Sequence, residues 1–233
     1  MENIIYLYKM MSLGFAYPDE NGWKFLEEFL PKSDLIFKGA LPRKLGELRE
    51  YFITHRPSLE EMQMEYLSFF DMGAKVIPYE TEYVQEKISR KPRLLADIAG
   101  FYKAFGFEAA SDAKNRESID HISVELEFMV LLYMKMLQAM EQGFEDRVQV
   151  VEDAIRKFLE DHLAGWGFLY CSLIQESDGH EFYKKLAGLL RAFLQDELTK
   201  YGMDPGPLQR GLFNPCQGST GWEDFTCGPV PPL

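Results

Sequence analysis

SIDHISVELEFMVLLY, residues 118–133, continues as a helical pattern as far as Gly143. On a helix turning by about 100° per residue, its polar side chains gather in one sector: Ser123, Glu127, Gln138, Asp120 and Glu141. His121 and Glu125 fall on the opposite, apolar side. Because an ionisable side chain there loses its hydration unless it finds a partner, these two residues either satisfy each other one turn apart or line a site.

The composition predicts a globular protein whose main binding partner is not a nucleic acid. The 233 residues are 46% hydrophobic and 14% aromatic, enough for one large domain or two small ones with a real core. A formal net charge of −12 argues against nucleic acid as the main partner, because phosphate binding relies on clusters of Lys and Arg. The acidic surface suits a basic partner, or serves solubility alone.

The amino terminus does not look like a secretory signal. Glu2 stands where such a signal would be basic, and Lys9 interrupts the apolar stretch early. No uncharged run approaches the roughly 20 apolar residues that cross a bilayer. We therefore expect no signal-driven export, no stable membrane insertion and a cytoplasmic location.

The three cysteines do not predict a disulfide framework or a zinc site. Cys171, Cys216 and Cys227 are few and scattered, and the sequence has no CxxC pair. Cys171 lies in an apolar segment, so we expect it in the core.

Apolar residues recur at spacings of three and four along most of the chain, which predicts helices. The predicted segments are 3–16, 23–30, 42–57, 58–73 behind a capping box at Ser58, 92–106 opened by Pro92, 118–143, 148–161, 168–174 and 182–201. Glycines beside Trp166 predict a break or kink over 161–167. No stretch alternates as a strand does. The expected fold is all-α: a single-domain bundle of about eight to ten helices over residues 1–202, followed by an irregular Pro/Gly-rich tail over 203–233.

Catalytic motifs are missing from the sequence. There is no GxSxG, HExxH, phosphate loop or dinucleotide-binding fingerprint. His121 and Glu125 could ligate a metal if a third group such as His162 joined them. His162 and Trp166 form a second pair one turn apart, which either packs in the core or belongs to a site.

Three segments in this order carry a family resemblance: Pro78-Tyr-Glu-Thr-Glu-Tyr83, Asp120-His-Ile-Ser-Val-Glu-Leu-Glu-Phe-Met129, and Phe158-Leu-Glu-Asp-His-Leu-Ala-Gly-Trp-Gly-Phe168. Together they resemble the TorD/DmsD/NarJ family of redox-enzyme maturation proteins, which are cytoplasmic chaperones for molybdoenzymes. The resemblance spans roughly residues 1 to 202. One departure is Ser118, where many members have Pro.

The resemblance implies an all-helical, non-enzymatic chaperone without cofactor or metal. It would bind the twin-arginine signal peptide and the apo form of a molybdopterin-containing oxidoreductase before export, as a monomer or a dimer. Carboxylates would receive the guanidinium groups and an aromatic-lined groove the apolar part. The predicted peptide-binding residues are Tyr79, Glu80, Tyr83, Asp120, His121, Glu125, His162 and Trp166. The alternative is a small helical metal-binding protein or enzyme that uses His121, Glu125 and His162.

Overall fold

The computed structural model describes residues 1–33, 37–71, 76–84, 87–108 and 117–204, and nine α-helices lie within these ranges. The helices are α1 (Glu2–Phe15), α2 (Glu20–Phe29), α3 (Leu41–His55), α4 (Leu59–Tyr66), α5 (Lys87–Phe105), α6 (Ile122–Glu141), α7 (Glu145–Phe158), α8 (Ala164–Glu176) and α9 (Glu181–Lys200). The described residues contain no strand beyond one isolated bridge. The expected all-α fold is confirmed.

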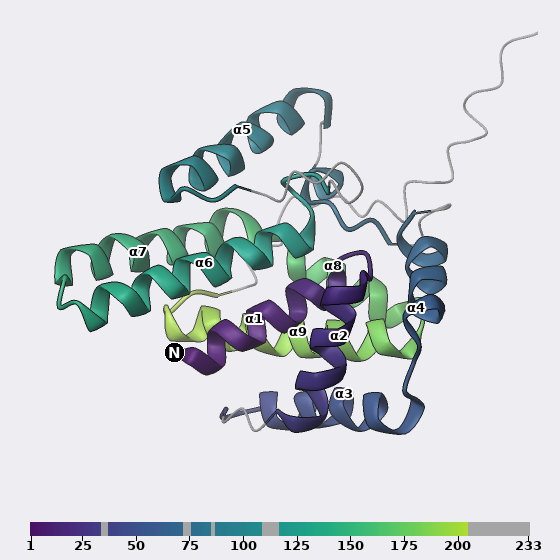
Figure 1. Cartoon of the computed structure of the whole chain (residues 1–233). Helices are drawn as coiled ribbons and strands as arrows, with labels where there is room; N and C mark the ends of the chain where they lie inside the picture. The colour runs from purple at the N-terminus through teal and green to yellow at the C-terminus, as the bar shows by residue number, and fades with distance from the viewer. Residues whose placement is uncertain (34–36, 72–75, 85–86, 109–116, 205–233) are drawn as a thin grey trace, which may run out of the picture.

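The helices form a bundle in which α6 and α7 make a long antiparallel pair (Figure 1). Helix α1 lies along α6, α8 and α9 pack together beneath them, and α3 lies against α9. Helix α5 lies on the outer side of α6 and α7. No helix among the described residues is both long and apolar enough to cross a membrane.

Local sequence signals set several helix ends. The predicted capping box opens α4: the Ser58 hydroxyl accepts from the backbone N–H of Glu61 at 3.2 Å, and the Glu61 carboxylate accepts from the N–H of Ser58 at 3.4 Å. Gly106 and Gly143 follow α5 and α6 with φ of +65° and +71°. That left-handed conformation is costly for residues with a Cβ, which explains glycine at both ends.

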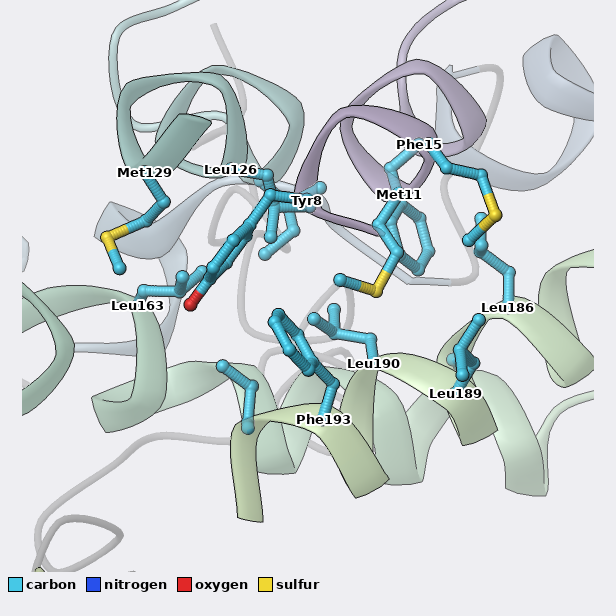
Figure 2. Packing of buried hydrophobic residues seen from close by; sticks show 14 of the residues in the cluster. Tyr8, Met11, Phe15, Leu126, Met129, Leu163, Leu186, Leu189, Leu190 and Phe193 are labelled. Carbon is cyan, nitrogen blue, oxygen red and sulfur yellow. The ribbon is translucent and has the colours of Figure 1, made fainter. Parts of the chain in front are cut away.

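The main core lies where α1, α6 and α9 meet (Figure 2). Tyr8, Met11 and Phe15 project from α1 towards α6 and α9. The Tyr8 ring packs edge-on against Phe193 with centroids 4.7 Å apart. Cys171 is fully buried as expected, and burial raises the pKa of its thiol to about 12.

Helix α5 is held on the bundle by aromatic contacts. Phe101 packs against Phe158 with ring centroids 5.4 Å apart, and Tyr102 packs against Phe128 at 4.7 Å. The Tyr102 hydroxyl also donates to the carbonyl of Ile119 at 2.8 Å. These contacts tie the second half of α5 to α6, α7 and the segment that leads into α6.

Two expected helix starts were wrong. Helix α6 begins at Ile122, and His121 is its N-cap, so Asp120 and His121 lie outside the helix. Pro92 lies inside α5, which begins at Lys87. The irregularity expected as a break or kink over 161–167 takes the form of a single π-helical turn, Leu159–Leu163, that joins α7 to α8; the extra residue in this turn re-aims the side chains that follow it.

The predicted tail over 203–233 falls almost wholly on residues 205–233, outside the described residues. Cys216 and Cys227 lie there as well.

Candidate functional site

The segment before η3 (Glu80–Tyr83) is joined to the start of α6 by backbone hydrogen bonds. An antiparallel bridge pairs Tyr79 with His121. Two bonds of 2.9 Å flank it, from the N–H of Glu80 to the carbonyl of Asp120 and from the N–H of Ile122 to the carbonyl of Pro78. Two of the three segments that carried the family resemblance therefore meet at one place.

Asp120 is a buried structural acceptor. Its Oδ2 accepts from the backbone N–H of Thr81 at 3.2 Å and from the Thr81 hydroxyl at 2.6 Å, while the Ser118 hydroxyl donates to Oδ1. The residue is 2% exposed. The expectation that Asp120 lies on the polar face of the central helix was wrong, because the helix starts after it and the chain turns its carboxylate towards η3.

His121 is completely buried and caps α6 with its side chain. Ser123 presents its backbone N–H and its hydroxyl to Nδ1 at 3.2 and 2.7 Å. With Nδ1 accepting, Nε2 carries the hydrogen and faces the Tyr66 hydroxyl oxygen at 3.2 Å. Burial lowers the pKa of His121 to about 4, although the Glu117 carboxylate opposes this shift. The imidazole is therefore neutral at physiological pH.

Glu117 is the surface end of this hydrogen-bonded chain. Its carboxylate accepts from the hydroxyls of Tyr66 and Tyr79 at 3.4 and 3.0 Å, and its Oε2 lies 3.9 Å from Nε2 of His121. The side chain of Glu117 is 23% exposed. Burial, with the nearby Glu117 charge, raises the pKa of both tyrosines. Both phenols thus stay protonated as donors, and the carboxylate keeps one side towards solvent.

Glu125 bonds to Trp166 instead of His121. The indole Nε1–H donates to Oε2 of Glu125 at 3.2 Å, while Oε1 is buried without a hydrogen-bond partner among the described residues. Burial and the neighbouring Glu80 carboxylate raise the pKa of Glu125. A neutral carboxyl group is the favoured form here, since ionisation would place two negative charges in a dry site.

His162 joins the π-helical turn to the same cluster. Its Nδ1 lies 3.2 and 3.3 Å from the two carboxylate oxygens of Glu80, which is also buried. Its Nε2 lies 3.4 Å from Oδ2 of Asp97, whose side chain is 60% exposed, without the geometry of a hydrogen bond. Burial raises the pKa of Glu80, and the hydrogen bond from His162 partly offsets this rise.

Tyr83 completes the apolar side of the cluster. It is fully buried, its hydroxyl donates to the carbonyl of Ile77 at 2.8 Å, and its ring lies 5.0 Å from that of Trp166. Phe128 on α6 is buried as well. The aromatic side chains that were expected to line a groove, Tyr83 and Trp166, are therefore buried inside the protein, and only Tyr79 is half-buried.

The sequence profile described as "Nitrate reductase delta subunit" matches residues 37–172, more than half of the chain. The chain belongs to the nitrate reductase delta subunit family. The matched range contains all the predicted site residues: Tyr79, Glu80, Tyr83, Asp120, His121, Glu125, His162 and Trp166. The family resemblance seen in the sequence is confirmed.

Curated relatives of this delta-subunit family member are named as chaperones. The chain is 28% identical over 208 residues to "Perchlorate reductase assembly chaperone protein" of Dechloromonas aromatica, covering 83% of this chain and 88% of the relative. It is 30% identical over 162 residues to "Selenate reductase assembly chaperone protein" of Thauera selenatis, covering 68% and 70%. It is 29% identical over 119 residues to "Chaperone protein TorD" of Photobacterium profundum, covering 51% and 53%. All three are chaperones by name, which agrees with the expectation that the chain is not an enzyme.

The alternative metal site does not assemble in the part of the chain that the structure describes. No group of three or more His, Cys, Asp or Glu side chains is arranged there to hold a metal ion. His121 and Glu125 bond to different partners, and His162 bonds to Glu80. No observation therefore favours the metal-binding alternative.

Four participants in the cluster were missed from the sequence: Tyr66, Thr81, Asp97 and Glu117. Glu117 could have been found, because it lies four residues before His121, within reach of the helix start. Thr81 lies within the segment 78–83 that carried the family resemblance, whereas Tyr66 and Asp97 come from distant segments and have no local signal. The structure gathers the eight predicted residues and these four into one region, most of it buried.

Proposed function

We propose that this chain is a cytoplasmic assembly chaperone for a molybdopterin-containing reductase, and that it binds the twin-arginine signal peptide of that enzyme's apo catalytic subunit. Membership of the delta subunit family carries the chaperone part of the proposal. The relatives named as assembly chaperones for perchlorate and selenate reductases support the class of client.

In this proposal, the buried carboxylates Asp120, Glu125 and Glu80 do not contact the peptide arginines. They hold in place the surface residues that do. Asp120, Glu125 and Glu80 are 0–4% exposed and have partners inside the protein. A guanidinium group could reach them only if the cluster opened, which would leave several buried polar groups unpaired at a cost of about 1–3 kcal/mol each.

Glu117 is the carboxylate that suits direct contact. It is partly exposed, and hydroxyl donors from Tyr66 and Tyr79 fix its orientation. A fixed carboxylate loses less side-chain entropy on pairing with an arginine, and a guanidinium group can donate two parallel hydrogen bonds to it. The half-buried Tyr79 ring lies beside it and could stack on the same group.

Isothermal titration calorimetry with the signal peptides of the host's molybdoenzymes tests this function. We expect binding that weakens when both peptide arginines are replaced by glutamine and when salt is added. Failure of the wild-type chain to bind any of these peptides would refute the signal-peptide proposal.

A conservative pair of variants tests the role of Glu117. Glu117→Gln keeps an acceptor for one of the two tyrosine hydroxyls, which bond to different carboxylate oxygens, and it removes the charge, so peptide affinity should fall by about tenfold, the loss of one hydrogen bond to a charged group. Glu28→Gln, at an exposed position on α2, removes the same charge elsewhere and should leave affinity within about twofold. Equal affinity for the two variants would remove Glu117 from the receptor while leaving the chaperone function standing.

A further inference from the structure

The antiparallel pair of α6 and α7 carries a groove near the turn that joins the two helices. Its cavity of about 350 Å³ is lined by Lys135, Gln138, Ala139 and Gln142 from α6 and by Asp146, Arg147, Val150 and Val151 from α7. The lining residues recur at spacings of three and four, so each helix presents one face to the groove. Cavities of roughly 300–1,000 Å³ are usual for sites that take up a ligand, and a groove between helices suits apolar peptide side chains.

Apolar surface is exposed at this groove. Val150, which lines it, is 60% exposed, and Phe144 at the start of α7 is exposed as well. The Arg147 guanidinium lies over the Phe144 ring, 4.4 Å from its centroid. Half of the large apolar side chains that are exposed in the described ranges belong to residues 134–150: Met134, Met140, Phe144 and Val150. Apolar surface gathered in this way and rimmed by polar residues is typical of an interaction site.

The ionic groups of the groove favour an acidic occupant. Lys135 and Arg147 form no ion pair with another residue of the described ranges, and Asp146 is the one acidic lining residue. The two cations come from opposite helices, one on each side of the groove. A segment lying between them can therefore offer a carboxylate to each, in charge-assisted hydrogen bonds.

The described part of the chain ends beside this helix pair. Nζ of Lys200, at the end of α9, lies 3.3 Å from the hydroxyl oxygen of Tyr133 on α6, close to the groove (Figure 1). Residues 205–233 follow from there. The chain from Asp204 to Trp222 can span up to about 60 Å when extended, whereas the groove residues of α6 lie within about 14 Å of Tyr133 along the helix axis. The terminal residues can therefore reach the groove.

We propose that this groove is the docking site of the chain's own segment Trp222-Glu-Asp-Phe225, which lies outside the described residues. The two aromatic side chains of the segment cover Val150 and its apolar neighbours, and its two carboxylates pair with Lys135 and Arg147.

The composition of the terminus selects this segment. Glu223 and Asp224 are the only acidic residues in 205–233, and an aromatic residue stands directly on each side of them. Phe213 is the one other aromatic residue of the terminus, and no acid accompanies it. The segment 222–225 alone therefore combines the two chemistries that the groove favours.

The inference goes beyond the proposed function and does not depend on it. The first groove residue, Lys135, lies about 20 Å along α6 from the helix start at Ile122, and Glu117 precedes that start. The tests below use no signal peptide, so this inference and the signal-peptide proposal can fail separately.

Acrylamide quenching of tryptophan fluorescence in the full chain tests the docking. Trp23 and Trp166 are buried, and the signal of Trp222 is isolated as the difference from Trp222→Phe. We expect Trp222 to resist quenching in the wild type. Val150→Asp places a polar, negatively charged group in the groove and should raise the quenching constant several-fold, towards that of a free tryptophan amide.

Met64→Asp is the matched control. Met64 is an exposed apolar residue on α4, and its replacement should leave the quenching constant at the wild-type value. A wild-type constant equal to that of the free amide would mean that Trp222 is not docked. Equal constants in Val150→Asp and Met64→Asp would mean that the segment does not use this groove. Either result would overturn the proposal.

Paired variants test the charges. Lys135→Gln with Arg147→Gln should raise the quenching constant, and added salt should do the same in the wild type. Lys103→Gln with Arg156→Gln removes the same charge from exposed positions on α5 and α7 and should have no effect. Equal effects of the two double variants would mean non-specific attraction and would overturn the proposal.

Dilution identifies the chain that supplies the segment. Docking within one chain does not depend on concentration, so the quenching constant should stay the same over about a hundredfold dilution. A constant that rose on dilution would mean that the segment occupies the groove of a second copy, and the proposal of docking within one chain would be wrong.

Discussion

Replacing His121 by Asn should remove most of the acid sensitivity that this side chain gives to the fold. The imidazole is completely buried, caps α6 through Nδ1 and contacts Tyr66 through Nε2. Asn is a good N-cap residue and keeps an acceptor for the Ser123 N–H, but it does not ionise. It loses the Tyr66 contact and some packing, so at pH 7 the variant should be about 1–3 kcal/mol less stable than the wild type.

The pH dependence follows from the lowered pKa of His121. Between pH 6.5, the ordinary pKa of histidine, and about pH 4, His121 is protonated in the unfolded chain but neutral in the folded chain. The stability linked to His121 is therefore complete above pH 6.5 and is lost as the pH falls towards 4, by roughly 3 kcal/mol at about 1.4 kcal/mol per pH unit. The wild-type and His121→Asn curves should converge, and meet or cross, as the pH approaches 4. Other buried acids affect both curves alike.

Urea unfolding followed by helical circular dichroism, in steps from about pH 7.5 to 4.5, measures the two curves. His55→Asn is the matched control: His55 is exposed at the end of α3, and its removal should leave the curve parallel to that of the wild type. Parallel curves for His121→Asn and wild type, or an NMR titration of His121 near its ordinary value of 6.5, would refute the reasoning.

Three other changes have defined outcomes. Glu125→Gln keeps an acceptor for the Trp166 indole and removes a carboxyl group whose pKa is raised well above 4.5, so its stability relative to wild type should increase as the pH rises above 4.5 in urea titrations. Gly179→Ala should cost about 1–3 kcal/mol by thermal or urea unfolding, because a Cβ there would lie 2.5 and 2.6 Å from ring atoms of Phe69. Ser58→Ala removes half of the capping box of α4 and should cost about 0.5–2 kcal/mol in the same assay.

Each of these three predictions would be contradicted by a specific result. A stability gain for Glu125→Gln that does not vary with pH would mean that the carboxyl group does not titrate abnormally. Gly100→Ala on α5 is the control for Gly179→Ala: within the part of the chain that the structure describes, no atom outside the helix's own backbone lies within 4 Å of a Cβ placed there, and this variant should gain up to about 1 kcal/mol of stability. If both alanines stabilised the protein, the predicted clash with the Phe69 ring would be wrong. Full stability of Ser58→Ala would mean that solvent caps α4 equally well.

Helix positions could be read from the sequence because the signals are local. The spacing of apolar residues, the capping box at Ser58 and the glycines after α5 and α6 act within one or two turns. The errors arose where tertiary contacts decide. His121 reads as a helical residue, yet it caps α6 because Tyr79 pairs with it across a bridge. The π-helical turn before Trp166 likewise places His162 against Glu80, far away in sequence.

For the candidate site, too, some features could be read from the sequence and others depended on the tertiary structure. By itself, the sequence established that His121 and Glu125 stand among apolar residues and need partners, and that the segments around Tyr79, Asp120 and Trp166 resemble one family. Only the tertiary structure decided their partners, Tyr66 for His121 and Trp166 for Glu125, and it buried the predicted carboxylates Glu80, Asp120 and Glu125 while leaving Glu117 partly exposed. The physical reason is that desolvation forces a buried polar group to find a partner without specifying which one, and packing of distant segments makes that choice.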